Sequence, residues 1–200
     1  MRKFTQSLAL AALLLSTSAY AQNVAPAATV AAKAAKVPWL YEGSDVPVDD
    51  TWTFGVLPNG LRYAVKKNDV PAGQVSIRVR IDAGALHENN DEQGFAHLIE
   101  HLSFRGSTFV PDGEAKRIWQ RFGVTFGSDS NAQTTPTQTV YKLDLPNATP
   151  EKLDESVKII SGMIRNPRIS TSALNAERAI VLAELRENSG AQMVYSDALR

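Results

Sequence analysis

The alternation of apolar and polar residues predicts that the chain forms strands from about Trp52 onwards. The segment 61–65 alternates directly after a Pro-Asn-Gly turn at 58–60, which is a signal of a β-hairpin. The segment 74–81 alternates again and places four β-branched residues on one face, a pattern typical of a strand with one buried side. These four residues are Val75, Ile77, Val79 and Ile81.

Four later segments carry the signals of helices. Asn89 is a capping residue followed by acidic groups, so a first helix is expected from there to about Phe104. The others are expected over 112–121, from 150 or 151 to 164, and from 170 or 171 onwards. The apolar positions expected on the last two helices are Leu153, Val157, Ile160 and Ile164, and then Leu174, Val181 and Leu185.

Two further strands are expected over 124–132 and 138–145, joined by a polar turn at 134–137. The chain therefore runs through strands, helices, strands and helices. This order indicates an α+β fold with a mainly antiparallel sheet packed against helices.

Residues 1–21 have the three parts of a secretory signal peptide. Arg2 and Lys3 give a positive start, residues 8–15 are continuously apolar, and Ala19-Tyr20-Ala21 places small residues before a cleavage site. The apolar run is well short of the roughly 20 residues that span a bilayer. We therefore expect export with cleavage, a periplasmic or secreted location for a bacterial protein, and no stable membrane anchor.

Composition narrows the class of the remaining chain. Residues 22–46 begin with an Ala- and Pro-rich stretch and are expected to be a linker before a domain over 47–200. Twenty-one Lys and Arg balance 21 Asp and Glu, so we expect no nucleic-acid partner. Because the chain has no cysteine, a disulfide, a thiolate nucleophile and Cys-ligated zinc are excluded. Any metal site must use His, Asp and Glu.

Two of the three histidines stand on one turn of the first predicted helix. His97 and His101 are four residues apart with Glu100 between them, so all three side chains lie on one side of the helix. Imidazoles and a carboxylate suit a tetrahedral zinc ion with one open position, where bound water becomes a nucleophile. Glu100 would take the proton of that water and pass it to the leaving amine. His87 precedes the helix and is expected to be structural or solvent-exposed.

A catalytic zinc site needs a third protein ligand, and the last predicted helix offers two acids, with Glu187 as a further candidate on a similar face. Glu177 and Glu184 are seven residues apart, which is two helical turns, and so face the same way. From the residues alone, either acid could reach the metal if this helix packs beside the first. Both could equally be solvated surface acids.

The sequence His97-Leu98-Ile99-Glu100-His101 is the inverted zinc motif H-x-x-E-H. With its surroundings, the chain resembles the pitrilysin/insulinase family of zinc metallopeptidases, which includes the mitochondrial processing peptidases. The resemblance implies a pitrilysin/processing-peptidase-like α/β roll and one Zn²⁺ per chain. It rests on residues 57–62, 94–96, 104–107, 131–141 and 177–184 and extends roughly from Trp52 to Glu187.

The resemblance also implies a role for each candidate residue. His97, His101 and Glu184 would be the zinc ligands, and Glu100 would be the general base. Glu177 would be a supporting acid of the catalytic site that fixes the orientation of a ligating histidine.

The resemblance further implies that an extended peptide pairs with a sheet edge near Asn131 and Ala132. We therefore expect a zinc metalloendopeptidase that acts on peptides or small unfolded proteins. Residues 47–200 would form its N-terminal peptidase domain, truncated at the C-terminal end, with a second peptidase domain or subunit as partner. The fragment alone could then be inactive.

Two other interpretations remain open. A non-catalytic subunit could keep the fold and bind peptides or a catalytic partner, although such subunits typically lose motif residues that are present here. A purely structural metal site would need a fourth protein ligand, and none is evident beside the motif.

Overall fold

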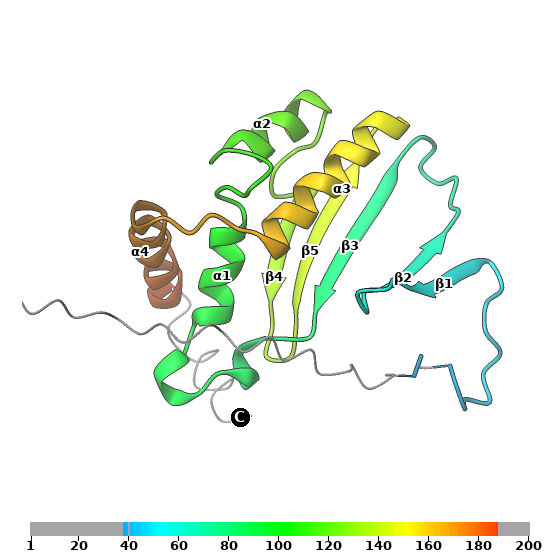
Figure 1. The fold of residues 1–200 in the computed structure, drawn as a ribbon, viewed down its shortest axis with the longest axis horizontal. Coiled ribbons are helices and arrows are strands. Elements are labelled where there is room, and N and C mark those ends of the chain that lie inside the picture. Colours follow the sequence, from blue (N-terminus) through cyan, green and yellow to red (C-terminus); the bar gives the residue numbers. More distant parts are fainter. Residues whose placement is uncertain (1–37, 40, 188–200) are drawn as a thin grey trace, which may run out of the picture. The chain divides into compact units, whose positions relative to one another are not determined.

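The structure is a computed structural model that describes residues 38–39 and 41–187. The predicted signal peptide and most of the predicted linker therefore lie outside the described residues. The chain divides into two compact units, one up to Lys66 and one from Lys67 onwards (Figure 1).

The described part of the first unit contains a β-hairpin, as the alternating pattern predicts. Strand β1 (Trp52–Val56) pairs antiparallel with β2 (Arg62–Lys66). In the turn, Gly60 has a φ of 87°, a conformation that a residue with a side chain adopts only with strain. An aromatic cluster made by Trp39, Tyr41 and Phe54 accompanies the hairpin.

The second unit contains a three-stranded antiparallel sheet. Its strands are β3 (Val75–Ile81), β5 (Thr139–Leu145) and β4 (Ser130–Thr134), in that order across the sheet. In β5 every second residue is buried, and in β3 every second residue is half-buried. The period of two therefore produces one covered face and one polar face.

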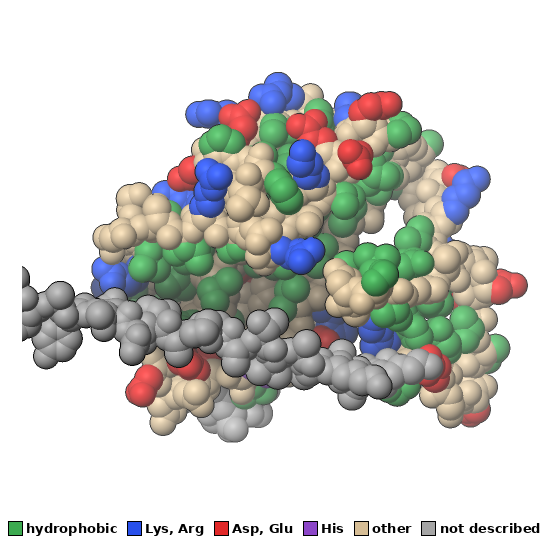
Figure 2. Space-filling view, in the orientation of Figure 1, with side chains coloured by type: hydrophobic (Ala, Val, Ile, Leu, Met, Phe, Trp, Pro, Cys, Tyr) green, Lys and Arg blue, Asp and Glu red, His purple; other side chains and the backbone are tan. Residues whose placement is uncertain are grey.

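Two helices supply the core that covers the apolar face. They are α2 (Glu114–Arg121) and α3 (Pro150–Arg165). The hydroxyl of Thr149 accepts a hydrogen bond from the Lys152 N–H and so caps the start of α3. In Figure 2 the outer side of these helices carries charged side chains. The least exposed core residues are Trp119, Leu143, Leu145 and Ile159.

The other two helices are α1 (Phe95–Ser103) and α4 (Thr171–Glu187). Helix α1 contacts both α4 and strand β4, and Figure 1 shows it between them. Helices packed on an antiparallel sheet confirm the predicted α+β class.

The strand predicted over 124–132 is shorter than expected, since β4 begins only at Ser130. A turn precedes it, in which Asp129 Oδ2 accepts a hydrogen bond from the Thr125 N–H at 2.8 Å. An aspartate that bonds to nearby backbone in this way competes with the strand ladder.

The buried face of α3 is also shifted from the predicted one. Ile160 is buried as expected, but Val157 is 50% exposed, and Ile159 and Met163 are buried instead. Helical spacing allows either set to face inward. Packing selects the observed face, because the helix turns Gly162 towards Ser107. The two residues are so close that a Cβ on Gly162 would lie only 2.6 Å from the hydroxyl of Ser107.

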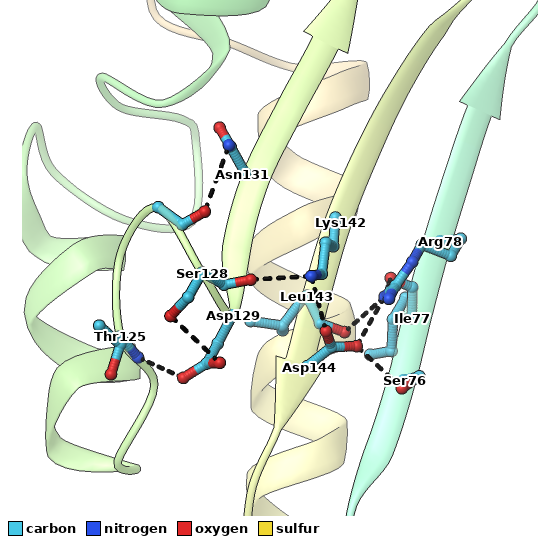
Figure 3. A network of polar contacts seen from close by, with 11 residues as sticks. Ser76, Ile77, Arg78, Thr125, Ser128, Asp129, Asn131, Lys142, Leu143 and Asp144 are labelled. Carbon is cyan, nitrogen blue, oxygen red and sulfur yellow. Dashed lines mark hydrogen bonds and ion pairs between the residues drawn. The ribbon is translucent and has the colours of Figure 1, made fainter.

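A polar network joins the strands on the sheet face opposite the core (Figure 3). Asp144 on β5 lies 2.8 Å from Arg78 Nη1, accepts a hydrogen bond from Ser76 Oγ at 2.8 Å, and lies 3.0 Å from Lys142 Nζ. Lys142 also donates to the carbonyl of Ser128 at 2.8 Å. Partial burial acts to raise the pKa of Asp144, but the hydrogen bonds from these three side chains outweigh it and lower the pKa to about 2.

We predict that Asp144→Asn lowers the free energy of unfolding by about 1 kcal/mol at neutral pH. Because the folded pKa is depressed, the carboxylate stabilises the fold above its unfolded pKa of about 3.9 and loses this effect as the pH falls through about 2. The full shift corresponds to about 2 kcal/mol, and the partial exposure of Arg78 and Lys142 reduces it. Urea denaturation at several pH values measures the difference, which should shrink steadily between about pH 4 and pH 2.

The matched control is Asp154→Asn, which changes an exposed aspartate on α3. It should alter the free energy of unfolding by less than about 0.5 kcal/mol. A difference between Asp144→Asn and the original chain that stays constant with pH would contradict the assigned network.

Candidate metal centre

Helix α1 begins after a glycine in the left-handed conformation. Gly94 has a φ of 91°, which separates α1 from the short helical turns before it. The two carboxylate oxygens of Glu88 accept hydrogen bonds from the backbone N–H groups of Gly94 and Ala96, both at 2.7 Å. The predicted capping role of Asn89 is confirmed only for a short helical turn, Asn90–Glu92. The prediction of one continuous helix from Asn89 to about Phe104 is wrong, because α1 begins at Phe95 and Glu88 caps it.

Helix α4 places Glu184 against the two histidines of α1. The Nε2 atoms of His97 and His101 are 3.2 Å apart. Glu184 Oε2 lies 3.4 Å from the first of these atoms and 3.5 Å from the second. Within residues 38–39 and 41–187, this is the one cluster of three or more His, Asp or Glu side chains that could hold a metal ion.

The triangle of potential ligand atoms has the dimensions of a zinc site. Around a tetrahedral zinc ion with bonds of about 2.0–2.1 Å, two ligand atoms are roughly 3.3 Å apart. The three sides of 3.2, 3.4 and 3.5 Å are close to this value. Two imidazoles and one carboxylate therefore fit a zinc ion both in chemistry and in spacing.

The other acid of α4 contacts the far side of one histidine ring. Glu177 Oε2 lies 3.1 Å from His101 Nδ1, and the side chain of Glu177 is 10% exposed. A carboxylate here favours the tautomer in which Nδ1 carries the proton and Nε2 presents its lone pair. The structure thus brings Glu184 to the ligand triangle and Glu177 to the opposite ring nitrogen.

Glu100 extends from α1 towards the edge strand β4. Its carboxylate is buried, and Thr134 Oγ1 donates a hydrogen bond to its Oε2 at 2.6 Å. Nearby, the hydroxyls of Tyr141 and Ser103 lie 3.1 Å apart. Burial raises the pKa of Tyr141, the hydrogen bond with Ser103 opposes this, and the charge of Glu100 raises the pKa further. Tyr141 is therefore a neutral hydroxyl at pH 7.

The two predicted substrate-contacting residues, Asn131 and Ala132, lie on β4. Asn131 is exposed and Ala132 is half-buried. Both pair with β5 on one side, and no strand of the described residues pairs with the other side of β4. Since Thr134 ends the same strand, this sheet edge leads directly to Glu100.

A cleft of about 340 Å³ opens beside His97 and Glu184. It lies between α1 and α4 and is largely apolar. The ligand triangle therefore borders an open, apolar surface. The apolar residues that line the cleft are Phe95, Leu98, Val181, Leu182 and Leu185.

Three residues of this centre were not assigned a role from the sequence. Glu88 lies six residues before Gly94, a separation that matches no capping motif. Thr134 contributed to the family resemblance, but the sequence did not indicate its contact with Glu100. Arg105 contributed only as part of the segment after the helix, and it lies 3.3 Å from Glu177.

His87 is exposed and its Nδ1 accepts a hydrogen bond from the Gly84 N–H at 3.2 Å, in agreement with the prediction.

A helix that carries H-x-x-E-H beside an antiparallel sheet, with a carboxylate supplied by a second helix, is the arrangement of an inverted-motif metallopeptidase domain. The profile of the family described as Insulinase (Peptidase family M16) matches residues 63–200. The chain belongs to this family, which confirms the resemblance inferred from the motifs.

Individual relatives support the same family. Two curated relatives are described as probable zinc protease PqqL. The one from Haemophilus influenzae is 35% identical over 147 residues, which cover 74% of this chain and 16% of the relative. The one from Escherichia coli is 32% identical over 155 residues, which cover 78% and 17%. This chain therefore spans about a sixth of the length of these curated relatives.

A solved structure shows the same fold. The first half of the periplasmic protease PqqL from Escherichia coli matches with a TM-score of 0.71 and 31% identity, over 76% of this chain and 33% of that one.

Among the described helices of the present chain, none is both long and apolar enough to cross a membrane.

We predict that Glu88→Ala destabilises the chain by about 1–2 kcal/mol. The change removes the acceptor of two N–H groups at the start of α1, and water replaces it only in part. Chemical denaturation measures the loss. The control is Asp91→Ala, at an exposed neighbouring acid, which should cost less than about 0.5 kcal/mol. Equal losses in the two variants would show that Glu88 does not cap the helix.

Proposed function

We propose that the chain is the metal-binding domain of a zinc-dependent endopeptidase that hydrolyses peptides or small unfolded proteins. The observation that carries this proposal is the triangle of His97 Nε2, His101 Nε2 and Glu184 Oε2, with sides of 3.2, 3.4 and 3.5 Å. Membership of the M16 family and the two relatives described as zinc proteases support it.

In this proposal His97, His101 and Glu184 hold one zinc ion. The ion would act as a Lewis acid that polarises a peptide carbonyl and lowers the pKa of a bound water. Glu177 holds His101 in the orientation that binding requires, through the contact of 3.1 Å at Nδ1.

Glu100 is the general base of the proposed reaction. Thr134 donates to Oε2 of Glu100, which leaves Oε1 to accept the proton of the attacking water. The same carboxyl group then delivers this proton to the leaving nitrogen. Burial of Glu100 between its own helix α1 and strand β4 supports a fixed position for the transfer.

The substrate would bind as an added strand along β4. Backbone hydrogen bonds at Asn131 and Ala132 would hold an extended peptide, whose carbonyl would replace Asn131 Oδ1 as the acceptor of the Ala132 N–H. The contact between Thr134 and Glu100 lies at the end of that strand. Because only an extended backbone can pair in this way, we expect peptides and unfolded chains as substrates.

We also propose a periplasmic or secreted location and a larger active form. The location rests on the features of a signal peptide in residues 1–21, and a related structure is that of a periplasmic protease. Since the chain spans about a sixth of the length of its curated relatives, a second peptidase domain or subunit would complete the active form.

The alternative is a non-catalytic subunit that binds peptides or a partner. It would have no need for a general base, whereas Glu100 is present, buried and hydrogen-bonded. Activity measurements on variants of Glu100 therefore separate the two proposals.

We predict about one zinc ion per chain, and loss of that ion in His97→Ala, because two ligands hold zinc weakly. Metal analysis of the purified chain after dialysis measures both. A metal-free original chain would contradict the proposed centre.

We predict that Glu100→Gln retains zinc and lowers peptide cleavage by at least about 100-fold, since the amide cannot accept the proton. The enzyme for this measurement is the product of the longest reading frame that contains this chain. Its substrate is an unfolded protein, whose cleavage is followed over time. The control is Glu155→Gln, at an exposed glutamate on α3, which should leave cleavage unchanged. Cleavage that survives Glu100→Gln would remove Glu100 as the base, and zinc binding without cleavage in the original protein would favour the non-catalytic subunit.

A further inference from the structure

The carboxylate of Glu177 is shared between a histidine and an arginine. Its Oε2 lies 3.1 Å from His101 Nδ1, and its Oε1 lies 3.3 Å from Arg105 Nε. His101 lies near the end of α1 and Arg105 lies two residues beyond that end, and both side chains reach the same carboxylate. Each oxygen of the buried carboxylate therefore has its own partner.

We propose that Arg105 is a positioning residue of the metal centre, which acts on the ligand His101 through Glu177. The proposal rests on the proposed zinc site. Arg105 holds Oε1, so that Oε2 stays directed at His101 Nδ1. The Nε2 atom of the same ring then stays in the ligand triangle, 3.2 Å from His97 Nε2.

The backbone near Arg105 is anchored in a way that suits this role. The Arg105 carbonyl accepts a hydrogen bond from the Gly113 N–H at 3.0 Å, and the Gly106 carbonyl accepts one from the Arg168 N–H at 2.8 Å. The second bond ties the exit of α1 to the segment that leads into α4. The elements that carry Arg105 and Glu177 are therefore connected directly beside the contact.

The contact between Arg105 and Glu177 is an attraction between charges. The Nε atom is shielded from solvent, and no acceptor among the described residues is aligned with its N–H. A carboxylate as buried as that of Glu177 is costly without a cation nearby. Asp112 lies 3.6 Å from the same nitrogen but is 56% exposed, so solvent screens it more.

The two charges have opposite effects on a metal cation. A guanidinium near the metal centre by itself repels the cation, and its pairing with Glu177 offsets this repulsion. Once Glu177 is neutral, Arg105 no longer has a carboxylate to hold, and only the repulsion remains. Removal of Arg105 should therefore weaken zinc binding only while Glu177 is charged.

A double-mutant cycle on the zinc affinity of the 200-residue chain tests the proposal. Affinity is measured by competition with a chromophoric chelator for the original chain, Arg105→Met, Glu177→Gln and the double variant. We expect Glu177→Gln to lose about 10–100-fold and Arg105→Met to lose about tenfold. The double variant should bind no more weakly than Glu177→Gln alone.

Two further variants separate positioning from a general structural role. Arg105→Lys keeps a cation and should restore affinity to within about threefold, because the contact depends on charge. Arg117→Met removes an exposed arginine of α2 and should leave affinity unchanged. Thermal unfolding of the metal-free proteins reports folding, and if Arg105→Met does not fold, the cycle is repeated with Arg105→Gln under the same criterion.

Losses that add in the double variant, or an Arg105 variant that binds zinc as tightly as the original chain, would overturn the proposal. These outcomes leave the zinc site itself intact. A chain that binds no zinc in any form would instead overturn the proposed function.

Discussion

Helix α4 presents a buried carboxylate to α1, and its apolar side chains other than Ala173 are at most half-buried. The buried residues of α4 are only Ala173 and Glu177, while Ile180, Leu182 and Leu185 are exposed. Burying a charge is unfavourable unless nearby partners compensate for it. His101 and Arg105 provide these partners at 3.1 and 3.3 Å, so the position of α4 depends on polar contacts with α1.

This arrangement links metal binding to folding in the proposed centre. His97 and His101 come from α1 and Glu184 from α4, so an ion held by all three residues joins the two helices. The binding free energy of such an ion then contributes to the stability of the helix pair. The sheet and the core of α2 and α3 do not share this dependence, because they are stabilised by buried apolar residues.

The local patterns predicted much of the fold, for physical reasons that differ between its elements. The alternation in β3 and the start of α3 at Pro150 follow local signals, and the structure agrees with both predictions. The exposure of Val157 and the capping of α1 by Glu88 depend on contacts with residues distant along the chain or on a loop without a regular motif, so local spacing could not reveal them.

The candidate site shows the same division. The spacing of His97, Glu100 and His101 placed all three on one turn, but spacing alone could not choose between Glu177 and Glu184. These acids share a side of α4, and only the position of the His101 ring separates their contacts. The pairings of Thr134 with Glu100 and of Arg105 with Glu177 join separate elements and carry no sequence signature.

One edge of β4 has no partner strand among the described residues, and this edge has a cost as well as a use. A strand with free backbone groups is a template on which any extended chain can pair, including another copy of the same protein during folding. Here the edge is only five residues long, and its exposed side chains, Asn131 and Gln133, are polar. A short polar edge disfavours stacking into extended aggregates while it leaves room for a single strand. The strand that could recruit misfolded neighbours is thus limited by its own length and polarity.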